Sequence, residues 1–403
     1  MAERAPRVIL AVTGGIAAYK SAEVVRRLRD LGCDVTVAAT ASALEFVGEP
    51  TWAALSGKPV LSSIWQSTHT VAHVSAARQA DVIVVAPATA DCLSRTVQGR
   101  GDDVVGALLL MATCPVLMAP AMHTEMWLNA ATAANVAVLR ERGFLVVQPD
   151  VGRLTGPDSG PGRLPAPESL AALTYAAATR PAGLDLAGRS VVVTAGGTRE
   201  ALDPVRWLGN RSSGRMGYAI AAAAVARGAS VHVIAANVNL PDVAGATTEQ
   251  VTDHASLAAA VDAAARGTDA LVMAAAVSDY THSPQTQKVS RAPGQPWQVS
   301  LQATADILAG VAAARPEKSP MLIGFAAQTE PDEAALIEQA TAKLVAKGVD
   351  AVVANDVSGG AVFGEDEAAV VIVTRDGSVT RHASQPKLDI AHRVCDLIAS
   401  PAV

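Results

Sequence analysis

Two glycine-rich turns in this chain have the composition of phosphate-binding sites. Thr13-Gly14-Gly15-Ile16 follows an apolar run and opens a helical pattern, and Gly196-Gly197-Thr198 repeats that arrangement in the second half. Glycine lets the backbone approach an anion closely, and the first N–H groups of a helix are free to bind it. Neither turn has the third glycine of a dinucleotide fingerprint, so the spacing favours a mononucleotide over NAD. A tight turn without a ligand is the alternative.

Other residues of the first half lie in loops that follow apolar runs in the same way. Ligands of open α/β sheets bind beyond the carboxyl ends of the strands, so we expect these residues near one ligand. They are Thr40, Ser42, Ala88, Thr89 and His123. His73 stands at a helix start just before the strand DVIVV, where a lone histidine is otherwise a cap or a surface residue.

The second half has a further candidate anion site. Ser212-Ser213-Gly214-Arg215-Met216-Gly217 leads into an alanine-rich helix and offers hydroxyls, a cation and free N–H groups. Lys343 and Lys347 fall one helical turn apart and therefore share a face, which a solvated helix surface explains equally well.

The elements that position these residues alternate along the chain as apolar runs and alanine-rich helical patterns. Apolar strands separated by helices indicate a parallel sheet that helices cover on both faces. In the first half we expect strands over residues 8–12, 34–39, 81–86, 114–118 and 144–147. In the second half we expect them over residues 191–195, 230–235, 270–274, 321–325, 350–354 and 369–374.

The second half begins with RSVVVTAGGT, which repeats the pattern of RVILAVTGG near the N-terminus. We therefore predict an α/β fold of two doubly wound domains, residues 1–180 and 189–403, joined by a linker over residues 181–188. The segment Gln148–Pro167 is rich in glycine and proline. We expect it to be a long surface loop or a mobile flap over a site.

Composition excludes several classes of protein. The chain has 403 residues, of which 50% are apolar and 17% charged, so a disordered protein is excluded. The net charge of −6 argues against a nucleic-acid partner, and no run approaches the roughly 18 apolar residues of a membrane span. Because the cysteines are scattered, we expect free thiols in a cytoplasmic protein. They are Cys33, Cys92, Cys114 and Cys395.

The motifs of the first half resemble the flavin-dependent cysteine decarboxylases, in particular the phosphopantothenoylcysteine decarboxylase family. The resemblance rests on the Gly-Gly turn, a histidine followed by a short helix and ADVIVVAPATAD, and a PAM segment. It implies a flavodoxin-like flavoprotein sandwich in which His73 is the catalytic base. It implies FMN contacts at Gly14, Gly15, Ile16, Thr40, Ser42, Ala88 and Thr89.

Two positions of the first half depart from that family. His123 stands where the family has asparagine, and we expect it to contact the substrate. No cysteine lies between Val151 and Pro167, where the family carries an acid on its flap. Thr155 is nearest to that place, so we expect Thr155 or a bound water to return the proton.

The string GGTREALDPVRWLGNRSSGRMG resembles the phosphopantothenate–cysteine ligase family, as do AAAVSDY, ADIL, GFAAQT and ANDVS further along. The resemblance implies a Rossmann-like domain that uses CTP with Mg²⁺. Lys288 would promote formation of an acyl-cytidylate, Asn210 would assist attack by cysteine, Arg206 would contact substrate, and Asp279 would bind the metal. The implied CTP contacts are Ser212, Gly214, Ala275, Asp279, Lys288, Asp306, Ile307, Leu308, Phe325, Lys343 and Lys347.

Together the two resemblances imply a bifunctional enzyme of coenzyme A biosynthesis. Its substrates would be phosphopantothenate, cysteine and CTP, with no nucleic acid or membrane partner. The families imply trimers of the first domain and dimers of the second, which close into a larger assembly such as a dodecamer. The alternatives are a flavin-binding regulatory first half and an NAD-linked reductase.

Overall fold

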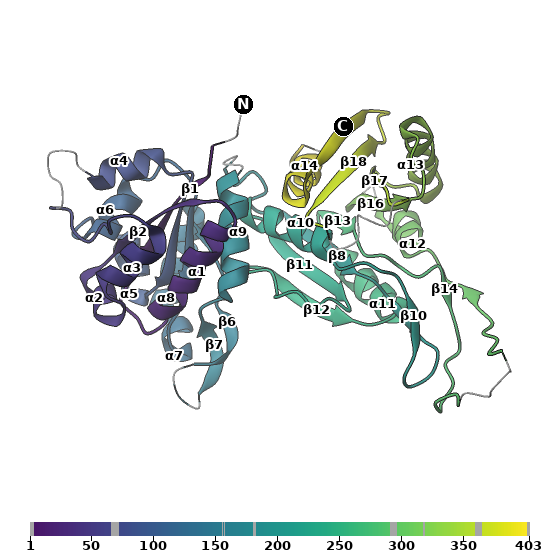
Figure 1. Cartoon of the computed structure of the whole chain (residues 1–403), viewed down its shortest axis with the longest axis horizontal. Helices are drawn as coiled ribbons and strands as arrows, with labels where there is room; N and C mark the ends of the chain where they lie inside the picture. Colours follow the sequence, from purple (N-terminus) through teal and green to yellow (C-terminus); the bar gives the residue numbers. More distant parts are fainter. Residues whose placement is uncertain are drawn as a thin grey trace. The chain divides into compact units, whose positions relative to one another are not determined.

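The computed structural model describes residues 4–65, 72–154, 156, 158–179, 183–290, 296–316, 319–358 and 365–400. The chain forms two compact units (Figure 1). The first contains residues 1–185, 225–228 and 241–245, and the second contains the remainder. The division between Asp185 and Leu186 falls inside the segment predicted as a linker. No helix within the described ranges is long and apolar enough to cross a membrane.

The first unit is built on a five-stranded parallel sheet of order β2-β1-β3-β4-β5. This is the flavodoxin-like strand order, in which the chain reverses direction across the sheet between β1 and β3. The predicted fold class is therefore confirmed for this half, and each expected strand is present. The strands are β1 (Arg7–Val12), β2 (Asp34–Ala39), β3 (Val82–Ala88), β4 (Val116–Pro120) and β5 (Leu145–Val146).

Helices connect these strands and cover the sheet. Helix α1 (Ala18–Asp30) buries Val24, Val25 and Leu28, which recur at helical spacing, and it packs beside α9 (Pro167–Thr179). The other helices are α2 (Ala41–Phe46), α3 (Glu49–Ser56), α4 (Ala72–Gln79), α5 (Ala90–Val97), α6 (Val104–Met111), α7 (Thr124–Trp127) and α8 (Ala130–Glu141).

The glycine- and proline-rich segment 148–167 contains a hairpin and is not an irregular loop. Strands β6 (Asp150–Arg153) and β7 (Ser159–Arg163) pair antiparallel. Gly162 adopts a positive φ of 145°, and a Cβ there would lie 2.2 Å from the Met122 carbonyl oxygen. The Met122 N–H donates to the Gly162 carbonyl at 2.9 Å. Glycine is thus required where β7 lies against the loop after β4, and this contact fastens the base of the hairpin.

The second unit is built on an eight-stranded sheet of order β12-β11-β8-β13-β16-β17-β18-β19. Its parallel strands have the order of a Rossmann sheet, which reverses between β8 and β13. Strands β18 and β19 add an antiparallel edge. The strands are β8 (Ser190–Gly196), β11 (Ser230–Ala236), β12 (Thr247–Val251), β13 (Ala270–Met273), β16 (Met321–Gln328), β17 (Ala351–Asp356), β18 (Glu367–Thr374) and β19 (Val379–Pro386).

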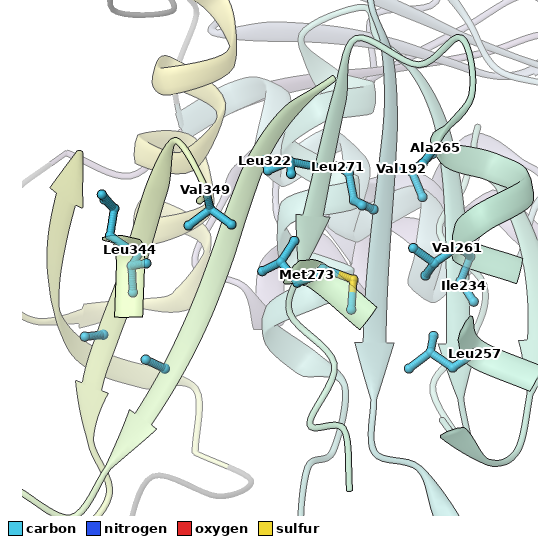
Figure 2. Packing of buried hydrophobic residues seen from close by; sticks show 14 of the residues in the cluster. Val192, Ile234, Leu257, Val261, Ala265, Leu271, Met273, Leu322, Leu344 and Val349 are labelled. Carbon is cyan, nitrogen blue, oxygen red and sulfur yellow. The ribbon is translucent and has the colours of Figure 1, made fainter. Parts of the chain in front are cut away.

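The core of the second unit lies between this sheet and its helices (Figure 2). Val192, Ile234 and Leu271 project from the strands toward Leu257 and Val261 of α11. The small aliphatic side chains of the two halves thus pack strands and helices closely, as the composition predicts. The helices are α10 (Arg215–Ala226), α11 (His254–Ala265), α12 (Ile307–Ala314), α13 (Glu333–Lys347) and α14 (Lys387–Ala399).

Two small hairpins of the second unit stand apart from its sheet (Figure 1). One pairs β9 (Arg199–Ala201) with β10 (Trp207–Gly209), and the other pairs β14 (Tyr280–Thr281) with β15 (Gln302–Ala303). The sequence pattern predicts neither, because each strand is only two or three residues long.

Candidate functional sites

A cavity of about 410 Å³ lies at the carboxyl ends of β1 and β3, where the strand order of the first unit reverses. We call it the N-terminal cavity. Open α/β sheets bind ligands at this position. Of the residues predicted for the first half, it is lined by Gly14, Gly15, Ile16, Thr89 and His123.

The glycine turn of this cavity has no room for a larger residue. A Cβ at Gly14 would lie 2.4 Å from Cβ of Ser42, so the backbone passes directly against the start of α2. The Thr13 hydroxyl donates to the Pro87 carbonyl at 2.7 Å and accepts from the Thr89 N–H at 3.2 Å. These bonds join the ends of β1 and β3 and form a cradle that fits a flavin phosphate.

Three residues predicted to bind FMN do not line the cavity. Thr40 is buried and accepts from the Ala43 N–H at 3.2 Å, which caps α2. Ser42 packs against Gly14, and Ala88 is the last residue of β3. In this structure these residues therefore support the walls of the cavity.

The cavity contains cations that the motifs did not indicate. Lys20 projects from α1, and Arg153 and Arg163 come from the hairpin. Burial lowers the pKa of Lys20, and the nearby Arg163 lowers it further. His123 places its Nδ1 3.6 Å from Asp158. A Lys in the first turns of a helix looks like an ordinary surface residue in the sequence, so only the fold reveals this charge.

His73 does not belong to the described lining of the N-terminal cavity. It lies near the start of α4, and its Nδ1 is buried and makes no hydrogen bond to the described residues. An unsatisfied buried ring nitrogen is unusual and calls for a partner. Thr155, the predicted proton donor, lies outside the described residues.

A larger cavity of about 750 Å³ lies at the carboxyl ends of β13 and β16 in the second unit. We call it the C-terminal cavity. It brings together nine of the twelve residues predicted for nucleotide binding and catalysis in the second half. These are Asn210, Ala275, Asp279, Asp306, Ile307, Leu308, Phe325, Lys343 and Lys347.

Charges of both signs face the C-terminal cavity. Lys347 pairs with Asp306 at 2.9 Å, and Asp306 also caps α12 through the Ala309 N–H at 3.0 Å. Burial opposes the charge of Asp306, but the Ala309 N–H and the Lys347 ammonium hold the pKa of its carboxyl below the ordinary value. Burial and the adjacent Lys347 lower the pKa of Lys343.

Asn210 is anchored at the rim of this cavity. Its side-chain amide donates to the Val277 carbonyl at 3.0 Å, which leaves the amide oxygen available to a ligand. Ser212 and Gly214 line a smaller adjoining cavity at the start of α10. The two cavities share Ala275, Ala276, Phe325 and Ala327 in their linings and therefore adjoin each other.

Lys288 lies outside the described lining of both cavities and is exposed. Its neighbour Val289 is held at both backbone groups. The Val289 N–H donates to Asp203 at 3.1 Å, and the Val289 carbonyl accepts from Arg206 at 2.6 Å. We call this arrangement the Val289 tether.

The tether rests on an ion pair between Asp203 and Arg206. The side chain of Asp203 is completely buried, and its hydrogen bonds with Arg206 hold the pKa of the carboxyl well below its ordinary value. The Arg206 guanidinium also stacks 4.3 Å from the Trp297 ring centroid. Arg206, predicted to contact substrate, does not line either cavity and holds the Lys288 loop in this structure.

No group of three or more metal-ligating side chains occurs in the described ranges. Asp279 and Asp306 are the acidic residues in the described lining of the C-terminal cavity, and both are exposed. This suits Mg²⁺, which proteins often bind through one or two carboxylates together with the phosphates of a substrate.

Two known families match separate halves of the chain. Residues 2–179 match the family described as Flavoprotein. Residues 186–402 match the DNA/pantothenate metabolism flavoprotein C-terminal domain.

Known proteins are similar to the chain over nearly its full length. It is 45% identical over 402 residues to the Coenzyme A biosynthesis bifunctional protein CoaBC of Mycolicibacterium smegmatis, covering 98% of this chain and 97% of that protein. It is 39% identical over 377 residues to the protein of the same name from Escherichia coli, covering 92% and 91%. A solved structure of a PPC decarboxylase mutant complexed with pantothenoylaminoethenethiol is 28% identical, with a TM-score of 0.39, and covers 43% of this chain and 97% of that chain.

Proposed function

The chain belongs to the family of bifunctional coenzyme A biosynthesis proteins, and from this premise we propose which reaction each of its two cavities catalyses. It is an enzyme that combines a phosphopantothenoylcysteine decarboxylase with a phosphopantothenate–cysteine ligase. The C-terminal cavity forms the amide between phosphopantothenate and cysteine. The N-terminal cavity then removes the cysteine carboxylate to leave phosphopantetheine.

The C-terminal cavity carries the ligase proposal because it gathers residues from five separate segments into one site of about 750 Å³. A carboxylate does not acylate an amine at neutral pH, so CTP first converts it to an acyl-cytidylate. Phe325 and Leu308 flank the nucleoside, while Lys343 and Lys347 face its phosphates. Asp279 holds Mg²⁺ together with those phosphates.

Two residues of this half act at successive steps. Lys288 swings from the Val289 tether to the cavity and stabilises the charge that develops as the carboxylate attacks the α-phosphate. Asn210 lies beside the acyl group and assists attack by the amine of cysteine. The Val277 carbonyl fixes the Asn210 amide in the orientation that this contact needs.

The N-terminal cavity is proposed to hold FMN, supported by the Gly14–Gly15 cradle and by the Flavoprotein family match. When bound, FMN would oxidise the thiol side of the substrate, which creates the electron sink for loss of carbon dioxide, and would then return the hydride. Gly14, Gly15 and Thr89 bind its phosphate, and His123 contacts the carboxylate of the substrate. Lys20, Arg153 and Arg163 add positive charge around these two anions.

His73 is the proposed base of the decarboxylase half, a role that suits a group titrating near neutral pH. Because it lies away from the cavity of its own chain, we propose that it acts in a neighbouring subunit. This explains the unsatisfied Nδ1 and supports a trimer of the first half. Dimers of the second half then close the trimers into a larger assembly. The four free cysteines suit a cytoplasmic enzyme.

The function is tested with purified protein, phosphopantothenate, cysteine, CTP and magnesium. We expect a yellow protein that releases pyrophosphate only when phosphopantothenate is present and then evolves carbon dioxide. A yellow protein that forms phosphopantothenoylcysteine without evolving carbon dioxide would support a regulatory first half instead. Loss of pyrophosphate release in the complete mixture would refute the ligase assignment.

A further inference from the structure

The glycine turn Gly196-Gly197-Thr198 of the second unit has the composition of an anion site, but it is packed into the protein. All three residues are buried, and none is among the described residues that line the C-terminal cavity or the smaller adjoining cavity. Gly196 has a φ of 84°, and a Cβ there would lie 2.0 Å from the Ala236 carbonyl oxygen. The crowded backbone at the end of β8 therefore accounts for glycine at this position.

The turn is bonded to the loop that follows β13 and lines the C-terminal cavity. The Gly196 carbonyl accepts from the Ala276 N–H at 2.8 Å, and the Ala276 carbonyl accepts from the Thr198 N–H at 3.1 Å. The side-chain hydroxyl of Thr198, a completely buried residue, then accepts from the Ser278 N–H at 2.8 Å. Three successive hydrogen bonds thus join the turn to the loop, and the last lies directly before Asp279.

Ser278 passes this restraint on to Asp279. Ser278 is buried, and its hydroxyl donates to the Tyr280 carbonyl at 2.7 Å. Its carbonyl accepts from the Thr304 hydroxyl at 2.8 Å, and the Asp279 carbonyl accepts from the Thr304 N–H at 2.9 Å. The backbone around Asp279 is therefore fixed, while Asp279 itself is exposed and lines the C-terminal cavity.

A buried carboxylate fixes the other side of the same segment. Glu200, two residues after Thr198, is only 5% exposed. One of its oxygens accepts from the His254 N–H at the start of α11, and the other accepts from the Thr281 hydroxyl, both at 2.8 Å. Thr198 and Glu200 thus anchor the loop on either side of Asp279. Buried polar groups are costly unless they are hydrogen-bonded, so these contacts are needed in the folded chain.

We propose that Thr198 is a positioning residue of the ligase, which keeps the Asp279 carboxylate in place at the C-terminal cavity through its hydrogen bond with the Ser278 N–H. The inference rests on the proposed function, in which Asp279 holds Mg²⁺ together with the phosphates of CTP. The second glycine turn then supports the nucleotide site from behind the loop that lines it. Small displacements of a positioned group can cost up to about 100-fold in rate, so such support has functional consequences.

The deciding variant is Thr198→Val in the full chain. Valine has nearly the shape of threonine but cannot accept from the Ser278 N–H, whereas Thr198→Ser keeps the hydroxyl. Thr268→Val is the matched control, because Thr268 is also buried and its hydroxyl donates to the Ser190 carbonyl at 2.9 Å near the amino end of β13. Asp279→Asn removes the carboxylate itself. The melting temperature of each variant reports on the fold.

Calorimetry measures the affinity for CTP with and without Mg²⁺, and cytidine serves as the ligand without phosphates. We expect Thr198→Val to lower the ratio of the CTP affinities with and without Mg²⁺ by about threefold to tenfold, the effect of losing one hydrogen bond. Cytidine binding should not change, because cytidine brings neither phosphates nor a metal ion. Thr198→Ser should restore most of the ratio, and Thr268→Val should leave it at the wild-type value.

A double-mutant cycle tests whether Thr198 acts through Asp279. In a chain that already carries Asp279→Asn, adding Thr198→Val should change the ratio by less than about twofold, because the two residues act on one contact. Additive effects of the two substitutions would overturn the inference. A wild-type ratio in Thr198→Val would also overturn it, as would an equal loss for cytidine and CTP with a lower melting temperature.

If Thr198→Val does not fold, Thr198→Cys replaces it in the same cycle with the same expected outcomes, because a thiol is a weak hydrogen-bond acceptor. A wild-type ratio in Asp279→Asn would refute the proposed role of Asp279 and the inference with it. Additive effects beside a lowered ratio in Asp279→Asn would refute the inference alone. The failure of the inference is thus distinguished from the failure of the proposed function.

Discussion

The two large cavities of the molecule differ in how they balance charge. Lys20, Arg153 and Arg163 line the N-terminal cavity, and none of its described lining residues is acidic. The C-terminal cavity instead places Asp279 and Asp306 beside two lysines. An anion can bind the first cavity through protein cations alone. The carboxylates of the second make it suited to a nucleotide that arrives with a metal ion.

The two halves also differ in how the proposed reactive residue reaches its cavity. His73 is part of α4 and does not line the described N-terminal cavity, so under the proposed function a second subunit brings it to the flavin. Lys288 is part of a loop, so a movement within one chain suffices. The proposed function therefore makes decarboxylation depend on assembly of subunits and ligation depend on movement of a loop. The experiments below test this difference.

The largest effect is expected for His73→Asn, which removes the proposed base. Decarboxylation should fall by about 10²–10⁴-fold, while ligation continues at the wild-type rate. Carbon dioxide and phosphopantothenoylcysteine are measured in the same reaction. His382→Asn, on β19 and outside both described cavity linings, is the control. Wild-type carbon dioxide release from His73→Asn would remove His73 from the mechanism.

Lys288→Gln should slow ligation by about 10²–10³-fold, the usual effect of losing one preorganised group that stabilises developing charge. The acyl-cytidylate should not form in this variant. In contrast, Asn210→Asp should accumulate it, because Asn210 is proposed to act after it forms. A quenched reaction analysed by mass spectrometry distinguishes the two, and the opposite pattern would reverse their roles.

Gly162→Ala should affect only the N-terminal cavity. The added Cβ meets the Met122 carbonyl, so the hairpin must shift and carry Arg153 and Arg163 with it. Small displacements of positioning groups can cost up to about 100-fold, and we expect decarboxylation to slow by about 10–100-fold. Gly310→Ala is the control, since nothing lies within 4 Å of that Cβ. Equal decarboxylation rates would mean that the hairpin does not position these cations.

The smallest effect is expected for replacement of all four cysteines by alanine or serine. None lies in the described lining of the N-terminal cavity, and burial raises the pKa of Cys33 and Cys92 to about 12 and of Cys114 to about 11. Decarboxylation should stay within about tenfold, or about 1.4 kcal/mol in the barrier. A much larger loss in a variant with a wild-type melting temperature would show that a thiol enters the reaction.

The sequence predicted the interior of each half better than its surface features. Buried strands such as Val82–Ala88 are apolar throughout and are recognised directly. Strand β19 is mostly polar and lies at a sheet edge, β6 is only four residues long, and β7 contains two glycines and a proline, so none of the three has a strand signal. The β6–β7 hairpin is fastened by the hydrogen bond from Met122 to Gly162, a contact that the sequence pattern does not show.

The candidate-site residues divide in the same way into those that the sequence indicates and those that only the folded structure reveals. Gly14 and Gly15 follow a predicted strand and line the N-terminal cavity as expected, and Asp306, which the ligase resemblance implies, lines the C-terminal cavity. Lys20 occupies an ordinary helical position, and only the packing of distant elements turns it toward a cavity. The roles of His73 and Lys288 rest on family resemblance, because neither contacts its cavity within one chain in this structure.

The Val289 tether limits the distance over which Lys288 can move. Adjacent Cα atoms are about 3.8 Å apart, so the Lys288 backbone stays within that radius of a point held by Asp203 and Arg206. If Lys288 acts at the C-terminal cavity as proposed, this restriction raises its effective concentration there, as a short linker does for a second binding group. Loss of Asp203 would relax that restriction, and the nucleotide would meet Lys288 less often even though its own binding contacts are unchanged.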